Sequence, residues 1–276
     1  MKINKIVSAV MLSIIFFLAA CSGANPSAAE RDDNNDRRFE IVTPTAIPED
    51  AWLYVAMGDS FTGLASWPEK YAAHLEEKLG VEILFKDRFI GAQKIIEMLE
   101  RIQTDEGLRK DIMQAKLITV NYGSDSFQVP IIKYKNGDCG GADGQDCLRE
   151  AFSQAELDWG AFLDELIALR PPEEAPIVTF MNGVGLVQST CAWGSDCWDV
   201  GTTYFIDWCN FIEQSATERG IYVVDVNKYF NGEDYRQPTN TDLLLSSGFH
   251  LNSNGSAIIV DLLKGLDLHE KPPLAP

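Results

Sequence analysis

Hydrophobic and polar positions alternate in blocks along most of the 276-residue chain. Five short apolar runs, rich in β-branched residues, predict buried strands at 52–57, 81–85, 117–122, 177–181 and 221–226. Longer stretches with apolar residues at helical spacing predict helices at 66–79, 91–101, 107–115, 148–170, 202–219 and 256–266. Such alternation indicates an α/β fold, a three-layer α/β/α sandwich around a five-stranded parallel sheet.

The N-terminus indicates export. Two lysines precede an apolar run over 6–18, which is too short to span a bilayer comfortably. We therefore predict a signal peptide over residues 1–20. The junction LAAC at 18–21 resembles a bacterial lipobox, in which Cys21 would carry the lipid. The alternative is an ordinary cleaved signal that a cysteine happens to follow.

The polar, charged stretch after the lipobox has no apolar period, which predicts a flexible tether over 21–50. We expect one domain over 51–270 and a tail over 271–276. A lipidated Cys21 would hold the domain at the cell membrane or outer membrane, facing outside the cytoplasm.

Composition narrows the class of protein. A hydrophobic share of 46% argues against disorder. Acidic residues outnumber basic ones by 41 to 23, which gives a formal net charge of −18. A chain so acidic repels phosphate backbones, so general nucleic-acid binding is excluded.

The cysteines fit an oxidising compartment. Cys139 and Cys147, and likewise Cys191 and Cys197, are close in sequence and are candidate disulfides, although other pairings stay open. Zinc is the competing interpretation, but there is no CxxC and no nearby histidine. The acids around Cys139 lack an EF-hand spacing, so we expect no metal. Cys209 lies in an aromatic run that favours burial.

The candidate chemistry lies at two distant points. Sites in parallel sheets form at the carboxyl ends of the strands. Ser60 follows the first predicted strand, and His250 precedes the last predicted helix. The other histidines, His74 and His269, lie in an amphipathic helix and in the tail. Serine attack needs a base within hydrogen-bond reach, so we predict Ser60 as nucleophile and His250 as general base.

The GDSFT motif at 58–62, with a late His250 in GFHLN, resembles the SGNH/GDSL hydrolases over about 52–266. The resemblance implies a flavodoxin-like sandwich, ester hydrolysis through an acyl-serine and no cofactor. It also implies that Gly91, in the family's second block, donates its N–H to the oxyanion. An ordinary α/β-hydrolase is the weaker alternative, because no serine lies in a G-x-S-x-G frame.

Two positions depart from the family pattern. The block GxND reads GSDS over 123–126, so Asp125 replaces an asparagine that donates to the oxyanion. A protonated Asp125 could still donate, or Asn121 or Asn182 could approach instead. The block DxxH reads SGFH over 247–250. Ser247 thus replaces the acid that orients the histidine, and a backbone carbonyl or Asp242 could take that role.

The sequence therefore predicts a membrane-anchored, extracytoplasmic serine esterase or lipase-type hydrolase. Its expected substrates are acyl or acetyl esters on lipids, glycans or small molecules, and we expect a monomer. The alternative is a catalytically weakened lipoprotein of the same fold that binds a surface glycan or peptide.

Overall fold

The computed structural model describes residues 47–48, 50–121, 124–181, 198–246, 248, 250–266 and 268. Its strands form one sheet in the order β2-β1-β3-β4-β5, and all neighbouring strands run parallel. They are β1 (Trp52–Gly58), β2 (Ile83–Asp87), β3 (Leu117–Asn121), β4 (Ile177–Met181) and β5 (Tyr222–Asp225). This is the flavodoxin-like order, so the predicted five-stranded parallel sheet is confirmed.

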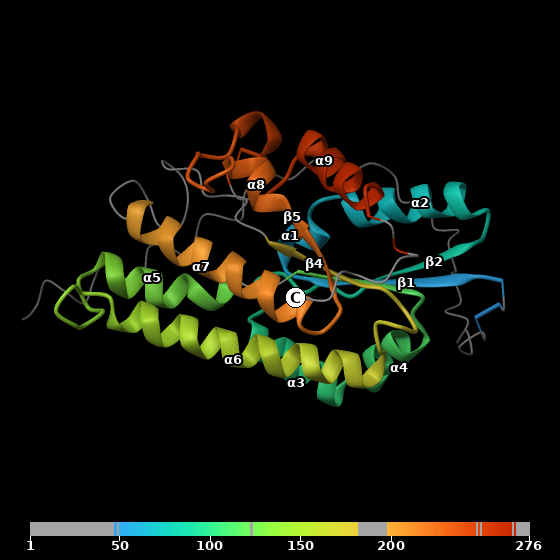
Figure 1. The fold of residues 1–276 in the computed structure, drawn as a ribbon, viewed down its shortest axis with the longest axis horizontal. Coiled ribbons are helices and arrows are strands. Elements are labelled where there is room, and N and C mark those ends of the chain that lie inside the picture. The colour runs from blue at the N-terminus through green and yellow to red at the C-terminus, as the bar shows by residue number, and fades with distance from the viewer. Residues whose placement is uncertain are drawn as a thin grey trace, which may run out of the picture. The chain divides into compact units, whose positions relative to one another are not determined.

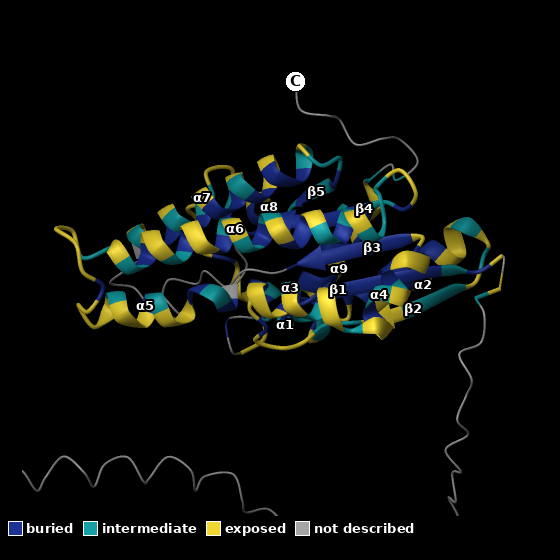
Figure 2. Ribbon diagram, turned by 90° about the horizontal axis from the view of Figure 1, so that it is seen from below, coloured by how far each residue is buried: buried dark blue, intermediate teal, exposed yellow. Residues whose placement is uncertain are grey.

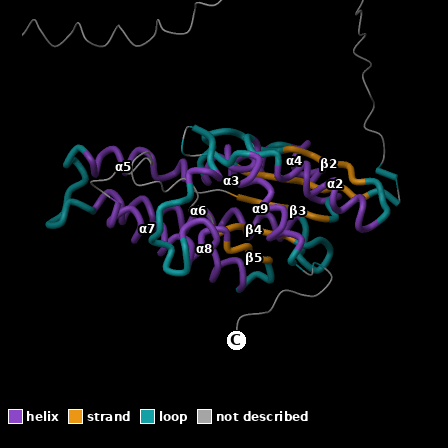
Figure 3. Tube along the Cα trace, turned by 90° about the horizontal axis from the view of Figure 1, so that it is seen from above, coloured by secondary structure: helices purple, strands orange, loops and turns teal. Residues whose placement is uncertain are grey.

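Helices cover both faces of the sheet (Figures 1 and 3). One face carries α3 (Ile95–Thr104), α4 (Glu106–Gln114), α5 (Gln128–Lys135), α6 (Asp146–Leu169) and α7 (Trp198–Thr217). The other carries α1 (Ser60–Gly63), α2 (Trp67–Leu79), α8 (Val226–Asn231) and α9 (Ser253–Lys264). Two 3₁₀ turns lie in the described connections, η1 (Ser124–Phe127) and η3 (Thr241–Leu243).

Each central strand contributes to two apolar cores. Along β1, Val55 and Met57 pack with the α3–α7 layer, whereas Tyr54 and Ala56 pack with α2 and α9. Both faces of β1, β3 and β4 are buried, as Figure 2 shows. The apolar runs were readable in the sequence because strands covered on both sides carry few polar residues.

Several predicted boundaries were wrong. Strand β2 begins two residues later than predicted, because its pairing places Ile83 opposite Trp52. Helix α3 begins at Ile95 and not at residue 91, since residues 91 and 92 form a turn. Ser66 precedes α2 as predicted, but its side chain makes no capping hydrogen bond. Helices α1, α5 and α8 were not predicted.

The disulfide between Cys139 and Cys147 is present, as predicted. Cys209 is a free thiol, and its full burial in the α3–α7 core was predicted. The pair Cys191 and Cys197 lies outside the described residues, as do Cys21 and the predicted signal peptide. Among the helices that the structure describes, none is both long and apolar enough to cross a membrane.

Candidate active site

Ser60 is the first residue of α1, directly beyond the carboxyl end of β1. Asp59 caps this helix, and its Oδ1 accepts a hydrogen bond from the Phe61 N–H at 3.0 Å. A Cβ at Gly58 would lie 2.0 Å from the Thr62 hydroxyl oxygen, so only glycine fits where the strand turns into the helix. The turn holds Ser60 half-buried at the edge of the sheet.

His250 reaches the same point from a loop 190 positions later in the chain. Its Nε2 lies 3.0 Å from the Ser60 hydroxyl oxygen. The backbone around it is fixed, because Leu245 donates its N–H to the His250 carbonyl at 2.7 Å and Leu244 bridges to Leu251. The structure thus brings together the two residues that the sequence selected, at hydrogen-bond distance.

Asp59 and Asn121 form a buried pair beneath the serine. The register between β1 and β3 places Gly58 beside Asn121, and the Asn121 amide donates to Asp59 Oδ1 at 3.2 Å. Burial, with a smaller contribution from nearby Asp125, raises the pKa of the Asp59 carboxyl to about 7. One N–H of the Asn121 amide is thus directed to Asp59, and the alternative that Asn121 supplies an oxyanion donor stays a prediction.

Asp125, in η1 beyond β3, is nine-tenths buried beside this cluster. Gln128 donates to its Oδ1, and its Oδ2 is buried with no hydrogen-bond partner among the described residues. Burial raises the pKa of Asp125, while a positive charge on His250 would lower it. Burial and the absence of a donor to Oδ2 both favour the protonated form of the carboxyl, which has an O–H to donate.

Gly91 lies in an exposed turn between β2 and α3. Two backbone hydrogen bonds tie the start of this loop to β1, from Arg88 N to Ala56 O at 2.8 Å and from Ile90 N to Gly58 O at 3.0 Å. No side chain would clash with a Cβ at Gly91, so packing does not demand a glycine there. Its predicted role as an N–H donor stays a prediction.

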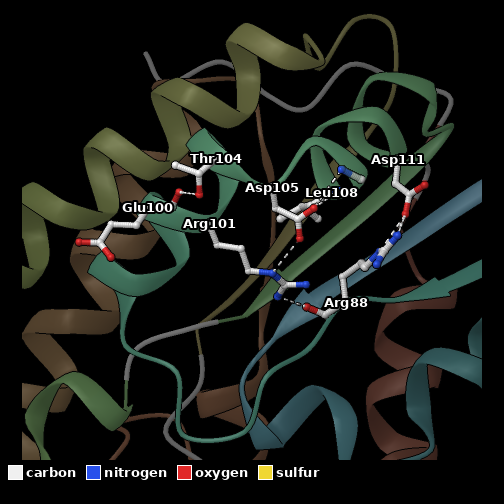
Figure 4. A network of polar contacts seen from close by, with 8 residues as sticks. Arg88, Glu100, Arg101, Thr104, Asp105, Leu108 and Asp111 are labelled. Atoms are coloured by element: carbon white, nitrogen blue, oxygen red, sulfur yellow. Dashed lines mark hydrogen bonds and ion pairs between the residues drawn. The ribbon is translucent and has the colours of Figure 1, made fainter.

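A polar network holds the other side of that loop (Figure 4). The Arg101 guanidinium donates to the Arg88 carbonyl at 2.9 Å and lies 3.6 Å from Asp105. The Arg88 Nε donates to Asp111 at 2.8 Å. The first residues after β2 are thereby anchored to α3 and α4 as well as to β1.

Ser247, Asp242 or a backbone carbonyl as the group that orients His250 stays a prediction. Ser247 lies outside the described residues, as does Asn182. Asp242 is exposed in η3, and its backbone carbonyl accepts a hydrogen bond from the Asn252 side chain at 2.8 Å. Within the described ranges, no three His, Cys, Asp or Glu side chains gather as metal ligands would.

Sequence reasoning missed two polar residues of the site. Gln128 donates a hydrogen bond to Asp125, but no motif in the surrounding sequence indicates a role for it in the site. Asn252 caps α9 by accepting from the N–H groups of Asn254 (2.8 Å) and Gly255 (3.1 Å). An asparagine directly before an apolar-periodic helix is a helix-start signal, so this cap could have been found.

No protein-family model matches the sequence, and no curated protein matches it. The solved structures do match. A lipase, Lip_vut3, from a goat rumen metagenome has a TM-score of 0.58 at 16% identity, over 77% of this chain and 96% of that one.

The chain has the SGNH/GDSL hydrolase fold. A lipase/acylhydrolase from Enterococcus faecalis has a TM-score of 0.52 at 12% identity, over 81% of this chain and 100% of that one. A variant of Axe2, an acetyl xylan esterase from Geobacillus stearothermophilus, has a TM-score of 0.52 at 14% identity, over 77% and 92%. The SGNH fold predicted from the short motifs is therefore confirmed.

Proposed function

We propose that the chain is a serine ester hydrolase of SGNH type. The observation that carries the proposal is the 3.0 Å approach between Ser60 Oγ and His250 Nε2 at the carboxyl edge of a parallel sheet. A neutral imidazole at that distance accepts the hydroxyl proton as the oxygen attacks, which is the arrangement that nucleophilic serines need. The similarity in fold to lipases and esterases agrees with it.

The reaction follows from these two groups. Ser60 Oγ bonds to the ester carbonyl carbon while its proton passes to His250 Nε2. The protonated His250 then gives the proton to the departing alcohol oxygen, which leaves an acyl group on Ser60. A water molecule, deprotonated by His250, attacks the acyl carbon and releases the carboxylic acid and free Ser60.

The carbonyl oxygen becomes negatively charged in each step and needs donors. We assign the backbone N–H groups of Ser60 and Gly91, joined by the O–H of a protonated Asp125. Asp125 suits this role because its Oδ2 has no partner in the described structure while Gln128 fixes Oδ1. An ionised Asp125 would repel the developing charge, so the donor set is complete only when that carboxyl is protonated.

The proposals for the protein's location and for its class of substrate are based mainly on the sequence. We propose that the protein acts outside the cytoplasm, anchored as a monomer through lipid on Cys21, and that it removes acyl or acetyl groups from lipids or glycans. Two of the similar solved structures are a lipase and an acetyl xylan esterase, which supports esters of this kind. Incorporation of labelled palmitate that is lost in Cys21→Ala would support the anchor, and incorporation that persists would contradict it.

Hydrolysis of p-nitrophenyl acetate tests the enzymatic proposal. We expect turnover by the purified protein that falls at least 10³-fold in Ser60→Ala and in His250→Ala. Ser66→Ala is the matched control, because Ser66 is exposed and its side chain makes no capping hydrogen bond. Turnover that persists in Ser60→Ala would contradict the proposal.

A second candidate function is a binding cleft without catalysis, for a surface glycan or peptide. Asp125 in place of a neutral donor favours it. This candidate requires that no turnover dependent on Ser60 be found and that a glycan or peptide bind at the Ser60 edge of the sheet.

A further inference from the structure

A separate cavity lies at the edge of the sheet opposite Ser60. It opens beside the first residues of β1 and β3, at Trp52 and Leu117, and beside Pro176, which precedes β4. Helices α2 and α9, which pack side by side, supply its other walls (Figure 1). Ser60 and His250 belong to the carboxyl edge of the sheet, so this cavity is distinct from the candidate active site.

The walls of the cavity are mainly apolar. They include Tyr71 and Leu75 of α2, Leu263 of α9, and Leu266 and Leu268 beyond it. Its volume is about 170 Å³. An apolar cavity of roughly 150 Å³ accepts a ligand the size of benzene, so this one has room for a chain segment of about six carbon atoms. An apolar void of this size favours an apolar guest over water.

Three lysines from three different elements line the same cavity: Lys78 of α2, Lys116 directly before β3, and Lys264 of α9. Lys264 forms an ion pair with Asp261 at 3.0 Å. Lys78 and Lys116 take part in no ion pair within the part of the chain that the structure describes. All three are exposed, and the ammonium groups of Lys78 and Lys116 can reach a ligand at the mouth.

The acid at the cavity has a partner of its own. Glu174 pairs with Arg170 at 2.6 Å, which offsets its charge. His74 also lines the cavity, with its ring stacked against Tyr71. In a chain of net charge −18, a cavity with three lysines and one paired acid is a local cationic site. Its charge therefore favours an anionic ligand.

We propose that this cavity binds a free medium-chain fatty acid. The last methylenes and the methyl group occupy the apolar walls, and the carboxylate lies at the mouth beside Lys78 and Lys116. A neutral alkyl ligand would contact the apolar walls but would form no ion pair with the lysines. Acetate would form the ion pair but is too short to contact the apolar walls. The proposal does not depend on the proposed ester hydrolysis, because it concerns other residues.

Calorimetric titration of the purified protein with decanoate, below its micelle concentration, tests the proposal. We expect saturable binding of one decanoate per chain, with 1-decanol binding about tenfold more weakly. Lys78→Ala combined with Lys116→Ala should weaken decanoate binding by about tenfold. Lys110→Ala is the matched control, because Lys110 is exposed on α4 and lies outside the cavity, and it should leave the affinity unchanged.

A second readout places the ligand. A decanoate brominated at its far end should quench tryptophan fluorescence, and Trp52→Phe should remove most of that quenching. The titration is repeated in Ser60→Ala with the active site filled by a non-hydrolysable ester analogue. We expect decanoate still to bind in the cavity between α2 and α9. If Ser60 proved not to be catalytic, the expected decanoate binding would be the same, so the two proposals are tested independently.

Any one of four results with the intact chain would overturn the proposal. They are absence of saturable decanoate binding, equal affinity for decanoate and decanol, binding that the paired lysine substitutions do not weaken, and binding lost when the active site is filled. Decanoate binding that appears only after deletion of 269–276 would also overturn it, since the chain's own C-terminal segment would then be the occupant.

Discussion

The side-chain amide of Asn252 donates to the backbone carbonyl of Leu244 at 3.1 Å, across the loop that carries His250. The same amide donates to the Asp242 carbonyl at 2.8 Å, while its oxygen caps α9. One side chain thus joins η3, the histidine loop and the start of the last helix. The hydrogen bonds of the Asn252 side chain go to the backbone on either side of His250 and to α9, so we regard it as a positioning residue.

Replacing Asn252 with alanine should therefore both destabilise the fold and misplace the base. Loss of the cap and of two hydrogen bonds should lower the free energy of unfolding by about 2–3 kcal/mol. At a temperature where the variant is still folded, kcat should fall by about tenfold or more, with KM nearly unchanged, because His250 is held less well.

Asn240→Ala is the matched control for that variant. Asn240 caps η3 by accepting from the Asp242 N–H at 3.0 Å, and its side chain makes no other hydrogen bond among the residues that the structure describes. We expect a loss of stability with kcat retained. Equal losses of kcat in both variants, or an unchanged kcat in Asn252→Ala, would show that Asn252 does not position the base.

Asp125 should give the enzyme a pH dependence that an asparagine would remove. The carboxyl donates only while it is protonated, and burial raises its pKa, so kcat/KM should fall as the pH rises through that raised value. In Asp125→Asn the amide donates at every pH, so the fall should vanish. At alkaline pH the variant should be faster, by up to roughly 10²-fold.

The pH–rate profiles of both forms check this prediction, with Asp138→Asn as an exposed control. The rates at low pH, where a protonated Asp125 donates as the asparagine does, should be the same in all three forms. A lower rate in Asp125→Asn over the whole pH range would mean that the carboxylate has a role that an amide does not replace.

Asp59 should make stability decrease as the pH rises. Its pKa is 3.8 in a free carboxyl and about 7 in the fold. Between these values the folded state keeps a proton that the unfolded state releases, so the free energy of unfolding falls with rising pH and levels off above about 7. The full decrease from this group is at most about 4 kcal/mol.

Denaturant unfolding of Asp59→Asn between pH 4.5 and 8 measures that decrease. An asparagine oxygen still accepts from Phe61 and Asn121 but does not titrate, so the variant should be the more stable form at pH 8 and should lose this part of the slope. A slope identical to that of the wild type would show that Asp59 is ionised throughout.

Much of the sheet could be predicted because its central strands β1, β3 and β4 are buried on both faces and therefore consist of short apolar runs. The site residues Ser60 and His250 could be predicted because each occurs in a short motif beside a strand end or a helix start. Helix α5 could not be predicted, because Pro130 and the flanking polar residues hide its only buried position, Ile131.

The surroundings of the buried acids Asp59 and Asp125 could be found only from the three-dimensional structure. Asp59 and Asn121 meet only because β1 and β3 pair in the register that places Gly58 beside Asn121. No pattern within either strand contains that information. The protonation of Asp125 depends mainly on its burial in the fold, and also on the hydrogen bond from Gln128 three residues later.

The central claim is that Ser60 is a nucleophile activated by His250. The most direct measurement is covalent labelling by a fluorophosphonate, with the modified residue located by mass spectrometry. We predict one label per chain, on Ser60, formed at least 10³-fold more slowly in His250→Ala and unaffected in Ser66→Ala. No label on Ser60 in folded wild-type protein, or a label that forms equally fast without His250, would contradict the account.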